Sequence, residues 1–198
     1  MTEMGRLLRS GIQGCVVGTW VEQVKVPQFG GMVKIVVEPD YSIFGLIHDI
    51  HVDDDGLVRQ LLSAQNVQME VIEDNRRNRN VPVEISVLYL GYEEGGDFYH
   101  LLPPRPPLSL DEIHPCLEGE INDFTDQGFG YFRHILRDTE IPTGELLASH
   151  LKDVSRVKST DWLNDALQEL IVQLRDDYPR LMALMGALRD AKLVFEQH

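Results

Sequence analysis

The chain has 198 residues, with 18 Lys and Arg against 32 Asp and Glu, which gives a formal net charge of −14. Because 43% of the residues are hydrophobic and 25% are charged, the composition is that of a globular protein with one large domain or two small ones. It excludes a disordered or collagen-like chain, and the acidic balance argues against broad attachment to the phosphates of nucleic acid.

The cysteine content and the hydropathy point to a reducing compartment. Only Cys15 and Cys116 occur, far apart in the sequence, so neither a disulfide framework nor a four-thiolate zinc site can be built. No apolar run is long enough to span a membrane, and Arg6 and Arg9 are not followed by a continuous apolar core. We therefore expect no signal peptide, no membrane anchor and a cytoplasmic location.

The first half of the chain has the pattern of short β-strands. β-Branched and aromatic residues form runs that are separated by turn residues such as Gly30-Gly31 and Gly95-Gly96. The short links favour antiparallel pairing, and closure of the sheet removes its exposed edges. The sequence thus predicts a small antiparallel β-barrel of six strands, at 12–18, 20–26, 32–38, 43–52, 83–92 and 97–102. Its regularity is interrupted over 57–80, where a helical turn and a polar loop are expected.

The second half is expected to be all-helical, which makes the fold class α+β. The segment 102–107 reads Leu-Pro-Pro-Arg-Pro-Pro and predicts a stiff extended connector between a barrel domain, 1–103, and a helical domain, 104–198. We expect the barrel domain to fold without the remainder. Helical spacing of apolar residues predicts short helices at 131–137 and 144–152 and two longer ones, 160–174 and 179–188, joined as an antiparallel hairpin.

The barrel segment resembles a known family. Cys15-Val-Val-Gly-Thr-Trp, Gly31-Met-Val-Lys-Ile-Val-Val-Glu and Ile43-Phe-Gly-Leu-Ile-His-Asp-Ile-His-Val follow one another in the order of a HAS barrel, and Tyr89-Leu-Gly-Tyr resembles its later strand. HAS barrels are the small six-stranded barrels at the N-terminus of HerA-like hexameric DNA translocases and of F-type ATP synthase subunits. The resemblance covers roughly the first half of the chain and implies association with a translocase-type assembly.

The chain departs from the translocases in one respect that decides the expected function. Their barrel is followed by a motor with a Gly-x-x-x-x-Gly-Lys-Ser/Thr loop, and this sequence contains no such element. We therefore expect neither binding nor hydrolysis of nucleoside triphosphates. Our first hypothesis is a non-enzymatic interaction module without cofactors, a HAS-like barrel with a helical appendage that associates with itself or with such an assembly.

The alternative hypothesis is a metal-assisted hydrolase or a nuclease. Asp49 and His51 lie on one face of the same expected strand, whereas alternation places His48 on the other face. Metal ligands would come from this pair and from the acidic stretch 111–126, which has six acids and no Lys or Arg and otherwise indicates a solvated surface. A nuclease would use the only basic cluster, Arg76, Arg77 and Arg79, although a solvated loop is the favoured explanation of this cluster.

The candidate contact surface for a partner lies in the last helix. Its apolar residues occupy more than one side of the helix, so it is either enclosed in its own domain or pressed against another chain. The candidate interface residues are Leu181, Met182, Met185 and Leu188. Such an interface would serve a second copy of this chain or a protein partner.

Overall fold

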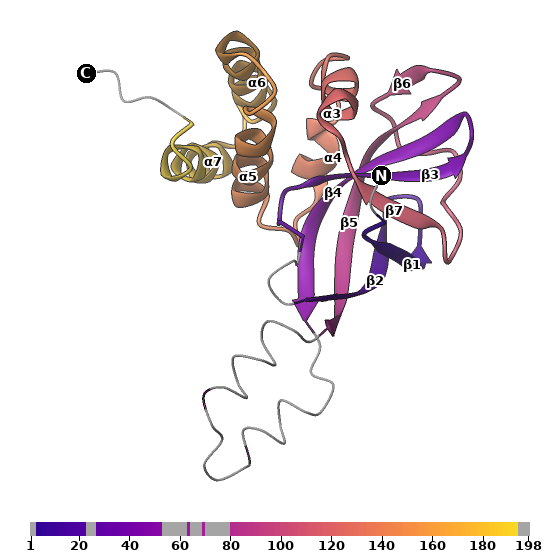
Figure 1. Ribbon diagram of the computed structural model, residues 1–198. Helices are drawn as coiled ribbons and strands as arrows, with labels where there is room; N and C mark the ends of the chain where they lie inside the picture. The colour runs from indigo at the N-terminus through magenta and orange to yellow at the C-terminus, as the bar shows by residue number, and fades with distance from the viewer. Residues whose placement is uncertain (1–2, 23–26, 53–62, 64–68, 70–79, 194–198) are drawn as a thin grey trace.

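The computed structural model describes residues 3–22, 27–52, 63, 69 and 80–193, and the structural statements below concern these residues. A β-barrel carries a group of helices on one of its sides (Figure 1). Its strands are β1 (Gly5–Ser10), β2 (Gly14–Glu22), β3 (Met32–Glu38), β4 (Tyr41–Val52), β5 (Asn80–Glu94) and β7 (Glu112–Pro115). A short strand, β6 (Asp97–Tyr99), follows β5 and pairs with its end in antiparallel orientation.

The six barrel strands form a closed ring. The neighbours in order are β1, β2, β5, β4, β3 and β7, and β7 pairs back to β1, with every pairing antiparallel. A small antiparallel barrel followed by helices is therefore confirmed.

The strands that build this ring differ from the expected ones. β1 and β7 were not predicted, the runs 12–18 and 20–26 contribute to the single strand β2, and the run 97–102 contains β6, which pairs only with β5. β7 has only four residues, of which only Ile113 is buried. So short a strand shows no alternation of apolar and polar residues by which it could be predicted. Ser109 and Glu112 have the spacing of a helix capping box, but Glu112 begins the strand β7.

The barrel interior is a closed apolar core. Side chains that alternate along the strands point inward, and among the described residues they include Leu7, Val17, Ile35, Ile43, Ile47, Val83, Ile85, Val87, Tyr89 and Ile113. Each of these side chains is at most 2% exposed. The barrel is consequently filled, and any ligand has to bind on its outer surface.

The helices cover part of the outer surface and build a second core there. They are α3 (Glu118–Thr125), α4 (Phe132–Arg137), α5 (Thr143–Val154), α6 (Thr160–Gln173) and α7 (Tyr178–Asp190). Outward side chains of the barrel, Phe44, Leu46 and Leu90, are fully buried beneath them. Phe124 of α3 stacks on Phe44 with ring centroids 4.8 Å apart. The helical half is thus docked on the strands by apolar contact.

The last two helices are arranged differently from the expected hairpin. A short turn joins α6 to α7, with the Asp177 amide donating to the Leu174 carbonyl at 2.9 Å, but α7 packs mainly on α5 (Figure 1). The two helices approach closely at Gly144, where a Cβ would lie 3.5 Å from the Cα of Leu184, an ordinary van der Waals distance. The apolar side of α6 therefore faces the core that the helices share with the outer surface of the barrel, rather than α7 alone.

The proline-rich connector lies against the barrel. The Arg105 carbonyl accepts a hydrogen bond from the Tyr41 hydroxyl at 3.3 Å, and its guanidinium forms an ion pair with Glu38 at 2.7 Å. Ser10 donates to the Pro107 carbonyl at 2.5 Å. The connector has bends at Pro104 and Arg105, and it leads the chain back into the barrel through β7 rather than away from it.

Two glycines are needed where the halves meet. Gly30 has φ +81, and a Cβ there would lie 2.7 Å from the side chain of Ser149 on α5. A Cβ at Gly91 would lie 2.3 Å from the carbonyl oxygen of Tyr99 and 3.0 Å from the ring of Phe124. Larger residues at either position would push the helices or β6 away from the barrel.

Candidate functional site

The residues of the metal hypothesis do not gather. Asp49 and His51 lie near the end of β4, both exposed, opposite Ser86 and Glu84 of β5. Strict alternation would place Ile50 on the same face as His48, but a bulge at His48 shifts the alternation, and Ile50 turns toward the barrel core. Within the part of the chain that the structure describes, no group of three His, Cys, Asp or Glu side chains could hold a metal ion.

Acids of the stretch 111–126 are engaged in joining the parts of the molecule. Glu112 pairs with Arg6 of β1 at 2.6 Å, Glu120 with Lys34 of β3 at 3.3 Å, and Asp126 with Lys158 at 2.5 Å. Four of the six acids, Glu112, Glu118, Asp123 and Asp126, are exposed, which agrees with a solvated surface, but these ion pairs were not expected. The three pairs reach different elements, so these acids do not converge on Asp49 and His51.

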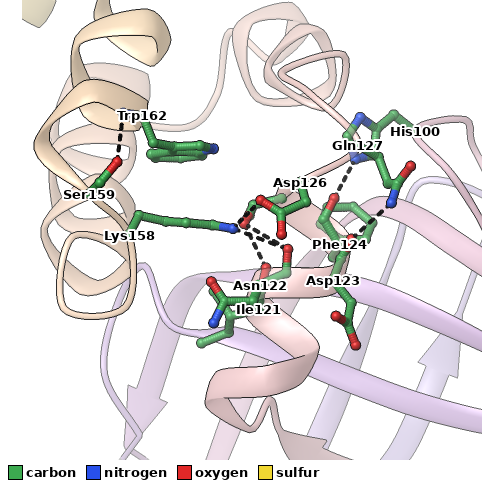
Figure 2. A network of polar contacts seen from close by, with 11 residues as sticks. His100, Ile121, Asn122, Asp123, Phe124, Asp126, Gln127, Lys158, Ser159 and Trp162 are labelled. Atoms are coloured by element: carbon green, nitrogen blue, oxygen red, sulfur yellow. Dashed lines mark hydrogen bonds and ion pairs between the residues drawn. The ribbon is translucent and has the colours of Figure 1, made fainter.

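Lys158 is the centre of one such junction (Figure 2). It lies between α5 and α6, and its side chain is only 6% exposed. Its ammonium donates to the Asn122 carbonyl at 3.2 Å and to Asp126, and it lies 5.9 Å from the centroid of the Trp162 ring. A positive charge at the last turn of α3 is favourable because the carbonyls there have no helical partners. Lys158 therefore fixes α3 to the start of α6.

We expect Lys158→Met to lower the free energy of unfolding by about 1 to 2 kcal/mol. The lost interactions are charge-assisted, but Asp126 is 63% exposed and regains water, which limits the cost. Urea unfolding followed by circular dichroism measures the change, with Lys152→Met, at an exposed lysine of α5, as the matched control. Equal stability of the two variants would contradict this role of Lys158.

The two cysteines are not suited to nucleophilic catalysis. Cys15 is buried in the barrel, where burial raises the pKa of its thiol to about 11, with the Tyr89 side chain acting in the opposite direction. Burial also raises the pKa of the Cys116 thiol. Since the thiolate is the nucleophile, neither thiol is activated at neutral pH.

The candidate interface residues of α7 divide into two groups. Leu188 is fully buried within the chain, and Leu181 and Met185 are partly buried against the same core. Met182 is 51% exposed. The outward surface of α7 is therefore carried by Met182, together with Tyr178 one turn earlier, which sequence reasoning missed.

A surface of exposed apolar residues flanks the turn between α6 and α7. Ile171 and Val172 in the last turn of α6 are 43% and 57% exposed, and Tyr178 in the first turn of α7 is 68% exposed. With Met182, these four residues are called the tip surface below. Four large apolar side chains this close in sequence are an unusual feature for the exposed end of a helical pair.

The basic cluster Arg76, Arg77 and Arg79 lies outside the described residues. Of the helices in the described part of the chain, none is long and apolar enough to cross a membrane.

Comparison with known proteins adds no assignment. No family model matches the chain, and a search of curated proteins finds no match.

Proposed function

We propose that this chain is a non-enzymatic interaction module, a HAS-like barrel whose helical half associates with a second copy of the chain or with a translocase-type assembly. The observation that carries the proposal is the tip surface, whose four apolar side chains remain 43% to 68% exposed in a chain with a net charge of −14. Contact with another protein would remove this surface from water.

The construction of the molecule also favours this proposal over the enzyme hypothesis. The barrel is filled by its own side chains, and its outer face carries a rigidly docked helical half. The residues suggested for metal chemistry, Asp49 and His51, are exposed, and Glu120 and Asp126 of the acidic stretch have lysine partners of their own. A platform that presents an exposed apolar surface suits binding better than it suits catalysis.

The partner that we favour for a first test is a second copy of the chain. We expect Met182→Glu to weaken self-association at least about tenfold, because a buried charge without a partner costs more than the apolar contact it replaces. Size-exclusion chromatography with light scattering over a range of concentrations measures the effect. The fold should be unchanged, because Met182 already faces water in the single chain.

Two further variants make the result decisive. Gln168→Glu adds the same charge at an exposed polar position of α6 and should leave association as it is. Met185→Glu places the charge against the core and should instead loosen the helical half. A wild-type chain that stays monomeric at all concentrations, with no protein retained through the tip surface, would refute the proposal.

A further inference from the structure

A groove runs along the junction of the barrel and the helices. Two hollows, with volumes of about 460 and 540 Å³, share His48 at the bulge of β4 and Asp138 at the end of α4. A smaller hollow shares Gln13 and Asp138 with the first and reaches Arg137. These adjoining hollows are called the junction groove, and their volume is in the range of sites for small ligands and short peptides.

The two ends of the junction groove differ in charge, since arginines occur at one end and a surplus of carboxylates at the other. Arg9 lines the first hollow and Arg137 the small one, and neither forms an ion pair with another residue that the structure describes. Asp49 and Glu140 line the second hollow, and Asp138 lines all three, so the second hollow is strongly acidic, whereas the other two each combine one arginine with this single carboxylate. His48 lies where the basic and the acidic hollows meet, and burial lowers its pKa, so that its ring is neutral at pH 7.

Apolar and hydrogen-bonding groups lie between the charges. The first hollow exposes Val16, Ser86 and Leu88 of the barrel wall, and the second exposes Phe29 and Ile141. A ligand in this groove would meet hydrogen-bonding groups along the length of the groove, apolar side chains beside them and charged side chains at both ends. This pattern matches a chain of peptide units with charged termini.

We propose that the junction groove binds a short zwitterionic peptide, with its carboxylate toward Arg9 and Arg137 and its ammonium toward Asp49 and Glu140. The direction follows from the charges of the two hollows, since the reverse orientation brings like charges together. The site is distinct from the tip surface and does not depend on self-association.

The test uses the full chain and the tripeptide Ala-Ala-Ala as the probe, followed by two-dimensional ¹H–¹⁵N NMR. Addition of the peptide should shift the backbone signals of Gln13, His48 and Ser86. N-acetylated Ala-Ala-Ala and Ala-Ala-Ala amide each lack one terminal charge and should bind about three- to tenfold more weakly. Free alanine carries both charges on one residue, cannot reach both ends, and should also bind more weakly.

Two variants connect each charge of the peptide to one end of the groove. With Arg9→Gln the amide should bind as well as the unmodified peptide, and with Asp49→Asn the acetylated peptide should do so. Both residues are exposed, so the fold should tolerate the changes, and Arg137→Gln repeats the first test at a second position. Arg189→Gln, at the exposed end of α7, is the control and should change nothing.

Several results would overturn the proposal. One is the absence of shifts at about 10 mM peptide, because a dissociation constant above this concentration is too weak for specific recognition. Others are shifts spread evenly over the surface, equal binding of alanine and tripeptide, or an effect of Arg189→Gln as large as that of Arg9→Gln.

Discussion

A fragment of residues 1–103 is expected to be unfolded, although the sequence alone favours its independent folding. The reason is the position of β7, which follows residue 103 and lies between β1 and β3 in the ring. Ile113 of β7 is fully buried and pairs with Gly5 on one side and Ile35 on the other. Without this strand the ring is open at two edges and its core meets water.

A fragment of residues 1–116 closes the ring and should recover strand content, but with low stability. It would expose the outward side chains that the helices cover, among them Phe44, Leu46 and Leu90. Each costs about 1.5 to 3 kcal/mol when exposed, so the sum of about 5 to 9 kcal/mol approaches the whole stability of a typical domain. We expect this fragment to aggregate or to bind a hydrophobic dye.

Circular dichroism and one-dimensional NMR of the three chains decide between these views. The full chain should unfold cooperatively, the longer fragment should be marginal, and the shorter one should show no dispersed signals. A cooperative transition of 1–103 at the midpoint of the full chain would restore the division at residue 103 and refute the role given to β7.

The parts of the fold that could be predicted are those with a long periodic signal. The runs in β3, β4 and β5 are rich in β-branched and aromatic residues over seven or more residues, and the apolar residues of α6 recur at helical spacing along its length. In β1 the alternation is brief, since a bulge follows Leu7, and β7 has only four residues. Such strands form because they pair with the adjacent strands of the ring, and the local sequence pattern does not reveal this pairing.

The charged residues were harder to interpret than the apolar ones. Glu120 and Asp126 belong to an acidic stretch that is typical of a solvated surface, yet each meets a lysine from a distant part of the chain. Lys34 stands among apolar residues in the sequence and Lys158 among mostly polar ones, and neither setting gives a sign of a partner. The junction groove was missed for the same reason, because Arg9, His48 and Asp138 come together only after the helices dock.

Acidification is expected to destabilise the protein through His150. This histidine of α5 is fully buried, its Nε2 atom lies 3.0 Å from the Tyr131 hydroxyl, and burial lowers its pKa from 6.5 to about 4, with the Gly30 backbone acting in the opposite direction. Burial also raises the pKa of the Tyr131 hydroxyl, which therefore stays protonated. The neutral imidazole can accept the hydrogen bond of this hydroxyl, whereas the imidazolium cannot.

The direction of the effect follows from the protons that each state binds. Below pH 6.5 an unfolded His150 takes up a proton, while the folded one does so only near pH 4, so the unfolded state gains stability as the pH falls. The contribution is fully present above pH 6.5 and decreases toward pH 4, by about 3 kcal/mol in total. His100 and His134, whose pKa values burial also lowers, act in the same direction.

His150→Gln should make the stability less dependent on pH, because glutamine can still accept a hydrogen bond but does not titrate. Urea unfolding at about pH 7.5 and about pH 4.5 should show a loss for the wild type that exceeds the loss for His150→Gln by about 2 to 3 kcal/mol. Tyr131→Phe is the matched control: it removes the hydroxyl but keeps the buried imidazole, so it should lower stability at both pH values and preserve most of the pH dependence. The buried His150 has to reach water before it can take up a proton, so its protonation is coupled to unfolding. Equal pH dependence of the wild type and His150→Gln would therefore mean that the acid sensitivity has another source.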